Sequence, residues 1–302
     1  MKLGLLNNLE NKAIIVTGSG GMLGSAFQEI LSKTSNKKVF CFTHAMLDVT
    51  DRKKVLSLSR LKPQIIIHCA AKVDADFCEV NPELCRAIQV LGTKNIIDLA
   101  KRSDAKIFYP QSFLIFSNSA KLIDEFTHPR PLSVYGKYKL EAEKLLLNDS
   151  SKHLIVRMGG MFGGHARDKN FVGKFARHLA ECIKGKVESK DVGDRLWQPT
   201  YTKDLAYNSL VLLSKGKTGI YSMGAHGEAT FYQVAREIAA HFKLPIITRK
   251  ISSKAFVEKT KRPDRAILSN AKLKSEGLDF QRHWKISLHE YLDDKYFRGL
   301  FQ

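Results

Sequence analysis

Tyr135 and Lys139 are the residues of this chain whose types and spacing point most directly to chemistry. They are four positions apart, so on a helix they lie on the same face. A free tyrosine titrates near pH ~10, and a neighbouring ammonium group favours the phenolate and lowers that pKa. Such a tyrosine can exchange a proton with a substrate oxygen while a hydride moves at carbon, and the lysine could also hold a nicotinamide ribose. The alternative is an ordinary surface helix, on which the same spacing serves packing and ion pairs.

A glycine-rich turn near the N-terminus provides the second half of this pattern. Gly18, Gly21 and Gly24 have the spacing G-x-x-G-x-x-G, one residue longer at the first gap than the commonest dinucleotide fingerprint. The turn follows a short apolar run, 13–16, and opens a segment with helical spacing, 22–32. Bare backbone amides there can approach a pyrophosphate, and the last glycine lets the helix pack close to the sheet. The predicted cofactor contacts are Gly18, Gly20, Gly21, Met22, Leu23 and Gly24.

The end of the second strand bears on the choice between NAD and NADP. NAD sites often place an acid there to hold the ribose hydroxyls. Here the strand ends at Phe42, Thr43 and His44, with no acid. This favours NADP(H), with NAD(H) as the alternative, and makes His44 a candidate contact. Asp48 is the next acid, and its structural interpretation is a helix N-cap.

Strands and helices alternate through the first half of the chain. The predicted strands are 13–16, 38–43, 64–69, 106–109 and 153–157, and the predicted helices are 22–32, 55–61, 82–101 and 135–147. This alternation is typical of an α/β fold: a Rossmann-like, doubly wound parallel sheet with right-handed crossovers and helices on both faces. After Arg157 the pattern loosens and glycines cluster, which predicts a second, smaller lobe packed against the first. Further helices are expected at 171–184, 203–213 and 231–242, and a strand at 219–223.

Ser112 comes just after the fourth predicted strand. A hydroxyl at that place could hydrogen-bond a substrate carbonyl. Its alternative role is to satisfy a backbone group at the end of the strand.

Composition limits the class of partner. The chain has 302 residues and a formal charge of +19, with 49 Lys and Arg against 30 Asp and Glu. Such a bias attracts anions, including phosphorylated small molecules, although a solvated lysine-rich surface accounts for much of it. Basic residues are spread along the whole chain, without a basic tail or an aromatic-interleaved basic stretch, so nucleic acid is not an expected partner.

Cysteine usage and hydropathy point to a cytoplasmic protein. The five cysteines form no C-x-x-C pair and their number is odd, so neither a metal site nor a disulfide framework is predicted. Residues 1–12 lack the apolar stretch of a signal peptide, and no run has the length of a membrane span.

With these residues in place, the chain resembles the extended short-chain dehydrogenase/reductases, and within them the dTDP-4-dehydrorhamnose reductase group. The matching segments are 17–24, 47–51, 69–71, 90–93, 112–116, 135–139, 198–200, 204–206 and 261–263. The resemblance implies a cofactor domain of residues 1–157 plus about 196–222, and a substrate lobe of about 158–195 and 223–302. It also implies Ser112, Tyr135 and Lys139 as catalytic residues. The further implied cofactor contacts are Asp48, Val49, Cys69, Ala70 and Ala71.

The substrate implied by the resemblance is a nucleotide-linked 4-keto-6-deoxysugar, reduced at C4. A basic lobe suits a diphosphate, because arginine grips phosphate in bidentate fashion. A homodimer is compatible with the resemblance. The candidate substrate contacts are Lys72, Phe113, Asn170, Arg195, Gln198 and Arg262.

The chain departs from the group around the sugar. Where the group usually has Ser-Thr-Asp-Tyr, this chain has Gln, Ser, Phe and Leu at 111–114; Gly160 stands in the place of a usual tryptophan, and Gln89 in that of a usual asparagine. Two alternatives therefore stay open. One is a non-catalytic, cofactor-binding regulatory subunit, similar to one found with a methionine adenosyltransferase. The other is a nucleotide-sugar epimerase; a dehydratase is disfavoured because residues 113 and 114 offer no acid.

Overall fold

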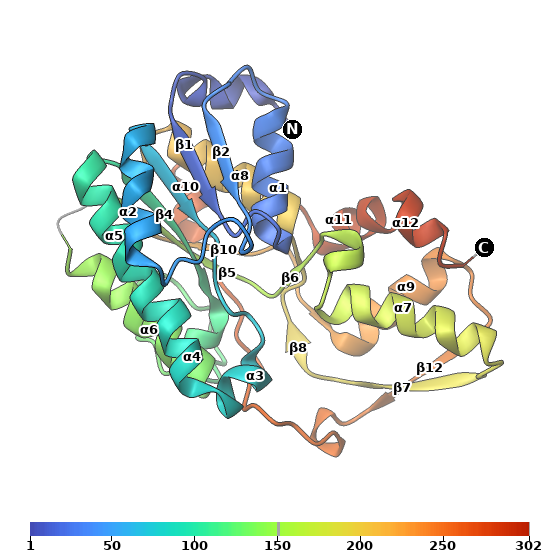
Figure 1. Ribbon diagram of the computed structural model, residues 1–302. Coiled ribbons are helices and arrows are strands. Elements are labelled where there is room, and N and C mark those ends of the chain that lie inside the picture. The colour runs from blue at the N-terminus through green and yellow to red at the C-terminus, as the bar shows by residue number, and fades with distance from the viewer. Residues whose placement is uncertain (150–151, 302) are drawn as a thin grey trace.

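A six-stranded, all-parallel sheet forms the centre of the larger part of the molecule in the computed structural model, which describes residues 1–149 and 152–301 (Figure 1). The strand order is β10-β5-β4-β3-β1-β2. The strands are β1 (Ile14–Thr17), β2 (Val39–Phe42), β3 (Ile65–His68), β4 (Lys106–Ser112), β5 (His153–Met158) and β10 (Gly219–Met223). All four residues of β1 and all four of β3 are buried, as expected for strands covered on both faces.

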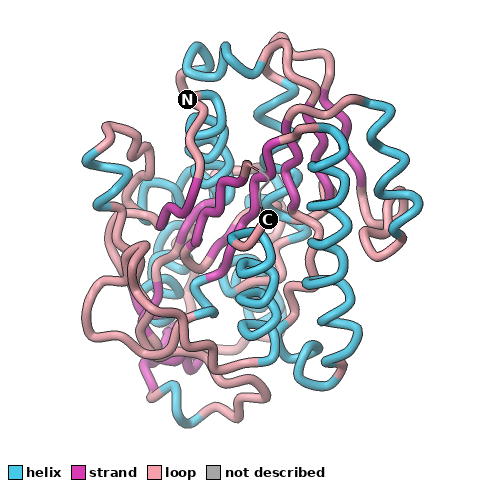
Figure 2. The backbone as a smooth tube through the Cα atoms, turned by 90° about the vertical axis from the view of Figure 1, so that its left-hand side faces the viewer, coloured by secondary structure: helices cyan, strands magenta, loops and turns pink. Residues whose placement is uncertain are grey.

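Helices cover both faces of this sheet (Figure 2). One face packs against α1 (Met22–Ser32) and α8 (Thr202–Ser214), and the other against α2 (Arg52–Ser57), α5 (Gly92–Ser103) and α6 (Val134–Leu147). The two core clusters are built from alternate residues of the strands, because successive side chains of a strand point to opposite faces. The predicted doubly wound α/β fold is confirmed.

The limits of some elements differ from their predictions. The expected single helix at 82–101 is α4 (Pro82–Arg86), a π-helical stretch (Ala87–Leu91) and α5. The fourth strand continues to Ser112 because it pairs with β5 along that whole length. Helix α2 begins earlier than predicted, and a 3-10 turn (Leu58–Leu61) follows it.

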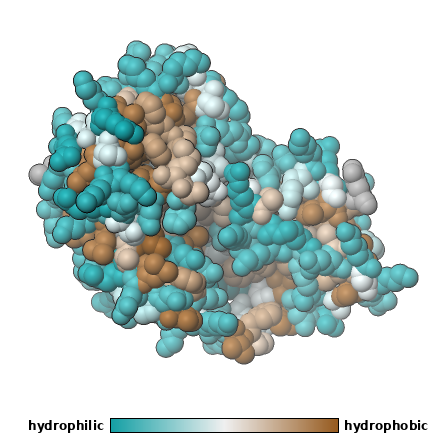
Figure 3. Space-filling view, in the orientation of Figure 1, coloured by the Kyte–Doolittle hydropathy of each residue, from teal (hydrophilic) through white to brown (hydrophobic). Residues whose placement is uncertain are grey.

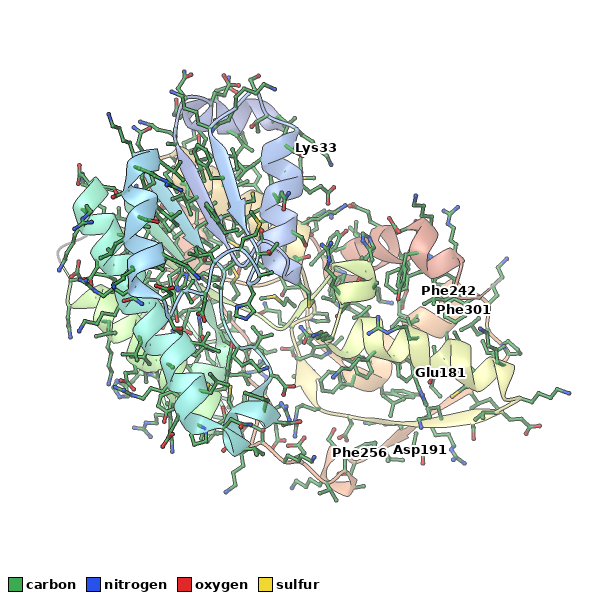
Figure 4. The ribbon with its side chains drawn as sticks, viewed as in Figure 1. Lys33, Glu181, Asp191, Phe242, Phe256 and Phe301 are labelled. Atoms are coloured by element: carbon green, nitrogen blue, oxygen red, sulfur yellow. The ribbon has the colours of Figure 1, made fainter. Side chains whose placement is uncertain are left out.

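A second hydrophobic core lies beside the carboxyl ends of the strands, on the right in Figure 1. It is rich in aromatic rings; Phe242 and Phe301, labelled in Figure 4, have ring centroids 4.4 Å apart. The helices around it are α7 (Phe171–Lys184), α9 (Phe231–His241), α11 (Trp284–Leu292) and α12 (Lys295–Arg298). Three two-stranded sheets border it: β6 (Met161–Phe162) with β9 (Thr200–Tyr201), β7 (Ser189–Gly193) with β12 (Ile247–Ile251), and β8 (Leu196–Trp197) with β11 (Ala229–Thr230).

The two cores exchange segments of chain. Trp197 and Tyr201 pack in the second core, although they fall within the stretch expected to join the sheet. Leu273, from α10 (Ala271–Ser275), and Leu278 pack against the sheet, although they follow the second core in sequence. The chain therefore passes between the two cores more often than the proposed boundaries of the cofactor domain and the substrate lobe suggest.

The face of the molecule shown in Figure 3 is mostly hydrophilic, with apolar patches on the larger, left-hand part. Among the described residues, none of the helices is long and apolar enough to cross a membrane. All five cysteines are free thiols.

Candidate active site

The glycine turn brings the end of β1, the first turn of α1 and the end of β3 into backbone contact. Gly18 has φ +65°, and a Cβ built there would lie 2.6 Å from the backbone nitrogen of Ala70, just after β3. At Gly24, in the first turn of α1, a Cβ would lie 2.2 Å from the carbonyl oxygen of Gly18. Both positions therefore need glycine. The result is a tight junction between β1, α1 and the end of β3.

The N-terminus of α1 is open to a ligand. Within residues 1–149 and 152–301, no side chain caps it. Gly20 and Gly21 are exposed and Met22 is half-buried, whereas the side chain of Leu23 is buried in the core. The free N–H groups of a first helical turn, together with the helix dipole, form an anion site, so this end of α1 can hold a pyrophosphate.

A hollow of about 380 Å³ runs along α1 from Met22 to Ser32. Its lining includes Met22, Gly164, Arg167 and Lys203. Lys203 forms an ion pair of 3.0 Å with Glu29, further along α1, so Arg167, which lies with Gly164 beside Met22, is the cation that adds positive charge near the predicted pyrophosphate position. The sequence analysis missed both because Arg167 and Lys203 lie far from the glycine turn along the chain.

The end of β3 links the glycine turn to the helix that carries Tyr135. Thr17 Oγ1 lies 2.9 Å from His68 Nδ1 and accepts a hydrogen bond of 3.2 Å from the backbone N–H of Ala70. Burial, and then the charge of Lys139, lowers the pKa of His68 to about 3. Burial raises the pKa of the Cys69 thiol, and the ammonium of Lys139 acts in the opposite direction. Lys139 thus lies close to residues 69–71, which follow β3. These residues are half-buried, and they are predicted cofactor contacts.

Helix α6 approaches the end of β4 unusually closely. The hydroxyl of Ser133 caps the helix by accepting a hydrogen bond of 3.1 Å from the N–H of Gly136. A Cβ at Gly136 would lie 2.3 Å from the carbonyl oxygen of Leu114. This contact brings Tyr135 next to Ser112, whose hydroxyl interacts with the phenol and favours its ionised form.

The expected effect of Lys139 on Tyr135 is not found. Burial raises the pKa of Tyr135 above its ordinary value, and the opposing contribution comes from Ser112. The Nζ of Lys139 instead donates a hydrogen bond of 2.8 Å to the carbonyl of Pro110 and lies 3.8 Å from the ring centroid of Tyr109. Burial lowers the pKa of Lys139 to about 7. The phenol is therefore protonated at neutral pH, and the prediction of an acidified tyrosine is wrong for this structure.

The predicted adenine-side contacts lie beyond β2. His44 and Asp48 are exposed, and Val49 is buried. The carboxylate of Asp48 accepts hydrogen bonds from the backbone and hydroxyl of Thr50, at 2.9 and 2.8 Å, which lowers its pKa. Asp51, rather than Asp48, is the N-cap of α2, so the structural interpretation of Asp48 is corrected.

Both candidate arginines are held by carboxylates of the protein. Arg195 forms ion pairs with Glu258 and, at 3.7 Å, with Asp264. Arg262 pairs with Asp76 of α3 (Ala75–Val80) at 3.0 Å. A phosphate contact would have to replace these pairs. Their role in gripping a diphosphate stays a prediction.

Gln198 and Asn170 also have internal partners. Gln198 Nε2 donates to the carbonyls of Ala225 and Leu268, at 2.9 and 3.2 Å, and its Oε1 accepts from the N–H of Leu268 at 3.1 Å. The exposed Asn170 donates to the carbonyl of Met161 at 2.8 Å. Gln198 therefore ties the segment of Ala225, in the second core, to that of Leu268, in a separate small cluster with Ile115 and Phe116, a role that the sequence did not suggest.

An aromatic surface, made of the half-buried ring of Phe113 and the buried indole of Trp197, lies where the sequence departs from the group of reductases that it resembles. The Cβ position of Gly160 is 2.6 Å from the indole of Trp197 and 3.6 Å from the ring of Phe113. Trp197 thus occupies the space that a side chain at position 160 would take. Lys72, the remaining candidate, lies with its Nζ 3.7 Å from the ring centroid of Phe77. Sequence reasoning missed Trp197 because it lies far along the chain from Gly160.

The comparisons with known proteins agree with this fold. The RmlD substrate binding domain family matches residues 12–297. The chain belongs to that family. A dTDP-4-dehydrorhamnose reductase from Clostridium acetobutylicum superposes with a TM-score of 0.85 at 31% identity, over 93% of this chain and 98% of that one. This confirms the resemblance drawn from the sequence.

Two further relatives differ in what their names state. A dTDP-4-dehydrorhamnose reductase from Bacillus anthracis, solved in complex with NADP, has a TM-score of 0.84 at 25% identity and covers 93% of this chain and 99% of that one. Methionine adenosyltransferase 2 subunit beta of Xenopus laevis is 26% identical, over 93% of this chain and 87% of that one. The relatives of this chain thus include both sugar-nucleotide reductases and a subunit of another enzyme. In the described part of the chain, no group of three His, Cys, Asp or Glu residues could hold a metal ion.

Proposed function

We propose that this protein is an NAD(P)H-dependent reductase of a nucleotide-linked 4-keto-6-deoxysugar. The observation that carries the proposal is the position of Tyr135, Ser112 and Lys139 at the carboxyl edge of a parallel sheet, beside the open N-terminus of α1. Ligands of doubly wound sheets bind at this edge. NADP(H) is the favoured cofactor because β2 ends at Phe42, Thr43 and His44 without an acid, and a relative is known with NADP bound.

The protonation state of Tyr135 suits reduction of a ketone. A bound reduced nicotinamide would supply the hydride. The phenol donates its proton to the keto oxygen, and the hydroxyl of Ser112 hydrogen-bonds that oxygen. Burial keeps the phenol protonated at neutral pH, so the proton is available. Lys139, which contacts Pro110 and Tyr109, orients the ribose and adds positive charge where negative charge develops on oxygen.

The aromatic surface of Phe113 and Trp197 supports a deoxysugar rather than a fully hydroxylated one. Both rings lie at the Cβ position of Gly160, two residues after Met158, the strand partner of Ser112. An apolar wall beside the reacting carbon gains from burying a methyl group, whereas it leaves a hydroxyl unpaired.

The test is the rate of NADPH oxidation with dTDP-4-keto-6-deoxysugars as substrates. Wild-type protein should turn over, and Tyr135→Phe should lose at least about 10²-fold in kcat because general acid catalysis supplies that much. Tyr207→Phe is the matched control: this buried tyrosine on α8 bonds to Lys2, away from the site. Unchanged activity in Tyr135→Phe would remove Tyr135 from the mechanism.

A non-catalytic regulatory subunit is the second candidate. It is favoured by the methionine adenosyltransferase relative and by the internal ion pairs of Arg195 and Arg262. This candidate predicts that NADPH raises the melting temperature while no sugar nucleotide is reduced, because binding to the folded form alone is sufficient for stabilisation. A co-purifying stoichiometric enzyme would support it, and turnover above about 1 s⁻¹ would exclude it.

A further inference from the structure

A third ionisable residue shares the buried face of α6 with the predicted catalytic pair. Tyr135, Lys139 and Glu143 follow one another at intervals of four and are 7%, 3% and 1% exposed. Glu143 forms an ion pair of 2.6 Å with Arg157 of β5. Residues spaced in this way lie one above another on a helix, so Glu143 is directly below Lys139.

The amide of Gln111 connects this face to the strand that carries Ser112. Its Nε2 donates to the backbone carbonyl of Lys139 at 3.0 Å and to Oε2 of Glu143 at 2.8 Å. Its Oε1 accepts from the backbone N–H of Ser112 at 2.8 Å. One buried side chain therefore bonds to both residues that flank Tyr135 in the site and to the carboxylate beneath them.

We propose that Gln111 and Glu143 are positioning residues of the reductase site. Gln111 fixes Ser112 on β4 against Lys139 on α6, and Glu143 accepts the second hydrogen bond of that amide and places a carboxylate one turn of α6 from Lys139. The inference rests on the proposed function for its kinetic readout and on the hydrogen-bond geometry for its structural one. It assigns a role to Gln111, a position at which this chain departs from the group it resembles.

The electrostatic part follows from the groups that face Lys139. Burial lowers its pKa, and the carboxylate of Glu143 is the largest opposing influence. From β3 it faces His68 and Cys69, both uncharged at neutral pH because of burial, and from β4 the ring of Tyr109. Since a buried ammonium needs a nearby anion to stay charged, loss of the Glu143 carboxylate should lower the pKa of Lys139.

The positioning role of Gln111 follows from the number of hydrogen bonds that its side-chain amide makes. Without Gln111, the N–H of Ser112 and the carbonyl of Lys139 lose a shared partner inside the protein, where no equivalent replaces it. The strand and the helix are then free to shift against each other. A displacement near 1 Å of a catalytic group is enough to reduce a rate by about 10²-fold.

The kinetic test compares Gln111→Met with Gln281→Met. Gln281 is also buried, and its Nε2 also bonds to a backbone carbonyl and a side-chain oxygen, those of Asp204 and Asn208. We expect Gln111→Met to lose about 10- to 100-fold in kcat with KM for NADPH within about twofold, and Gln281→Met to keep both. Equal kcat in the two variants, at similar melting temperatures, would overturn the role of Gln111.

Glu143→Gln tests the electrostatic part through the pH dependence. Activity should fall as the pH rises through the pKa of Lys139, and this limb should move to lower pH in the variant. If Arg157 without its partner prevents folding, the double variant Glu143→Gln/Arg157→Met removes both charges; because Glu143 is the influence that opposes burial at Lys139, the limb should still move to lower pH, by less than loss of the carboxylate alone would cause. An unmoved limb in a folded variant would refute the role of Glu143.

Failure of the proposed function can be told apart from failure of this inference. If the wild type reduces no sugar nucleotide, the dissociation constant of NADPH takes the place of the rate. The affinity for NADPH should then weaken as the pH rises through the pKa of Lys139. This weakening should occur at a lower pH in Glu143→Gln than in wild type or Gln281→Met. Identical pH dependence in all three proteins would overturn the inference whether or not turnover exists.

Discussion

Gly136→Ala tests whether the close approach of α6 to the end of β4 sets the geometry of the site. The added Cβ would lie 2.3 Å from the carbonyl oxygen of Leu114, whereas real Cβ atoms stay beyond 3.0 Å. The difference, 3.0 minus 2.3, requires a shift of at least roughly 0.7 Å between backbone atoms that cannot rotate away. Because Tyr135 is the preceding residue, its hydroxyl moves relative to Ser112. We expect kcat to fall by about 10- to 100-fold.

The assay is NADPH oxidation at saturating cofactor, with the melting temperature measured alongside. Gly185→Ala is the matched control: it ends α7, its φ is −83°, and the nearest atom to a Cβ there is 3.5 Å away. It should keep wild-type kcat. Replacing glycine by alanine inside a helix gains up to about 1 kcal/mol of helix propensity, so any loss of stability in Gly136→Ala would come from the displaced contact. Wild-type kcat in Gly136→Ala would refute the argument that this contact positions Tyr135.

Three further predictions concern the cofactor turn, the second core and the aromatic surface. Gly24→Ala should weaken NADPH binding at least about tenfold by calorimetry, because its Cβ would lie 2.2 Å from the carbonyl oxygen of Gly18 and must open the turn. Burial raises the pKa of Asp168 from 3.8 to about 6. Between these values the folded chain keeps a proton that the unfolded chain has lost, so wild-type stability should fall by up to about 3 kcal/mol as the pH rises from about 4 to 6, and Asp168→Asn should lack this fall. Trp197→Leu should raise KM for the sugar nucleotide and leave the dissociation constant of NADPH unchanged.

Each of these predictions has an outcome that contradicts it. Wild-type affinity in Gly24→Ala would mean that the turn does not contact the cofactor. Parallel denaturation profiles for wild type and Asp168→Asn across this pH range would mean that the carboxyl is ionised in the folded chain. If Trp197→Leu changes NADPH affinity as much as it changes KM for the sugar, the indole supports the fold and not the sugar.

Local patterns were sufficient to predict the sheet and the helix that carries Tyr135 and Lys139. The apolar runs that became β1 and β3 are continuous because both faces are covered, and the glycine spacing after β1 requires a tight turn. The extension of β4 to Ser112 was missed because Pro110 and Gln111 are poor indicators of a strand. Pairing with β5, which no local pattern reveals, decides that boundary.

The proposed sugar side of the site depends on contacts between distant segments. Trp197 meets Gly160, and Arg262 meets Asp76, across separations that sequence spacing does not encode. The expected acidification of Tyr135 also failed for a three-dimensional reason. Lys139 shares its helix face, but the carbonyl of Pro110 takes the ammonium and burial raises the pKa of the phenol. Spacing predicts which residues meet, whereas burial decides how they titrate.

Transfer of deuterium from NADPH labelled at nicotinamide C4 tests the central claim most directly. With the two C4-labelled forms of the cofactor supplied in turn, wild-type protein should place one deuterium at C4 of the sugar from one of them, as measured by mass spectrometry of the product. Tyr135→Phe should bind the cofactor and form labelled product far more slowly. Label-free product, or no product from wild type that binds both the cofactor and the keto sugar, would contradict the claim that these residues reduce a carbonyl with a nicotinamide hydride.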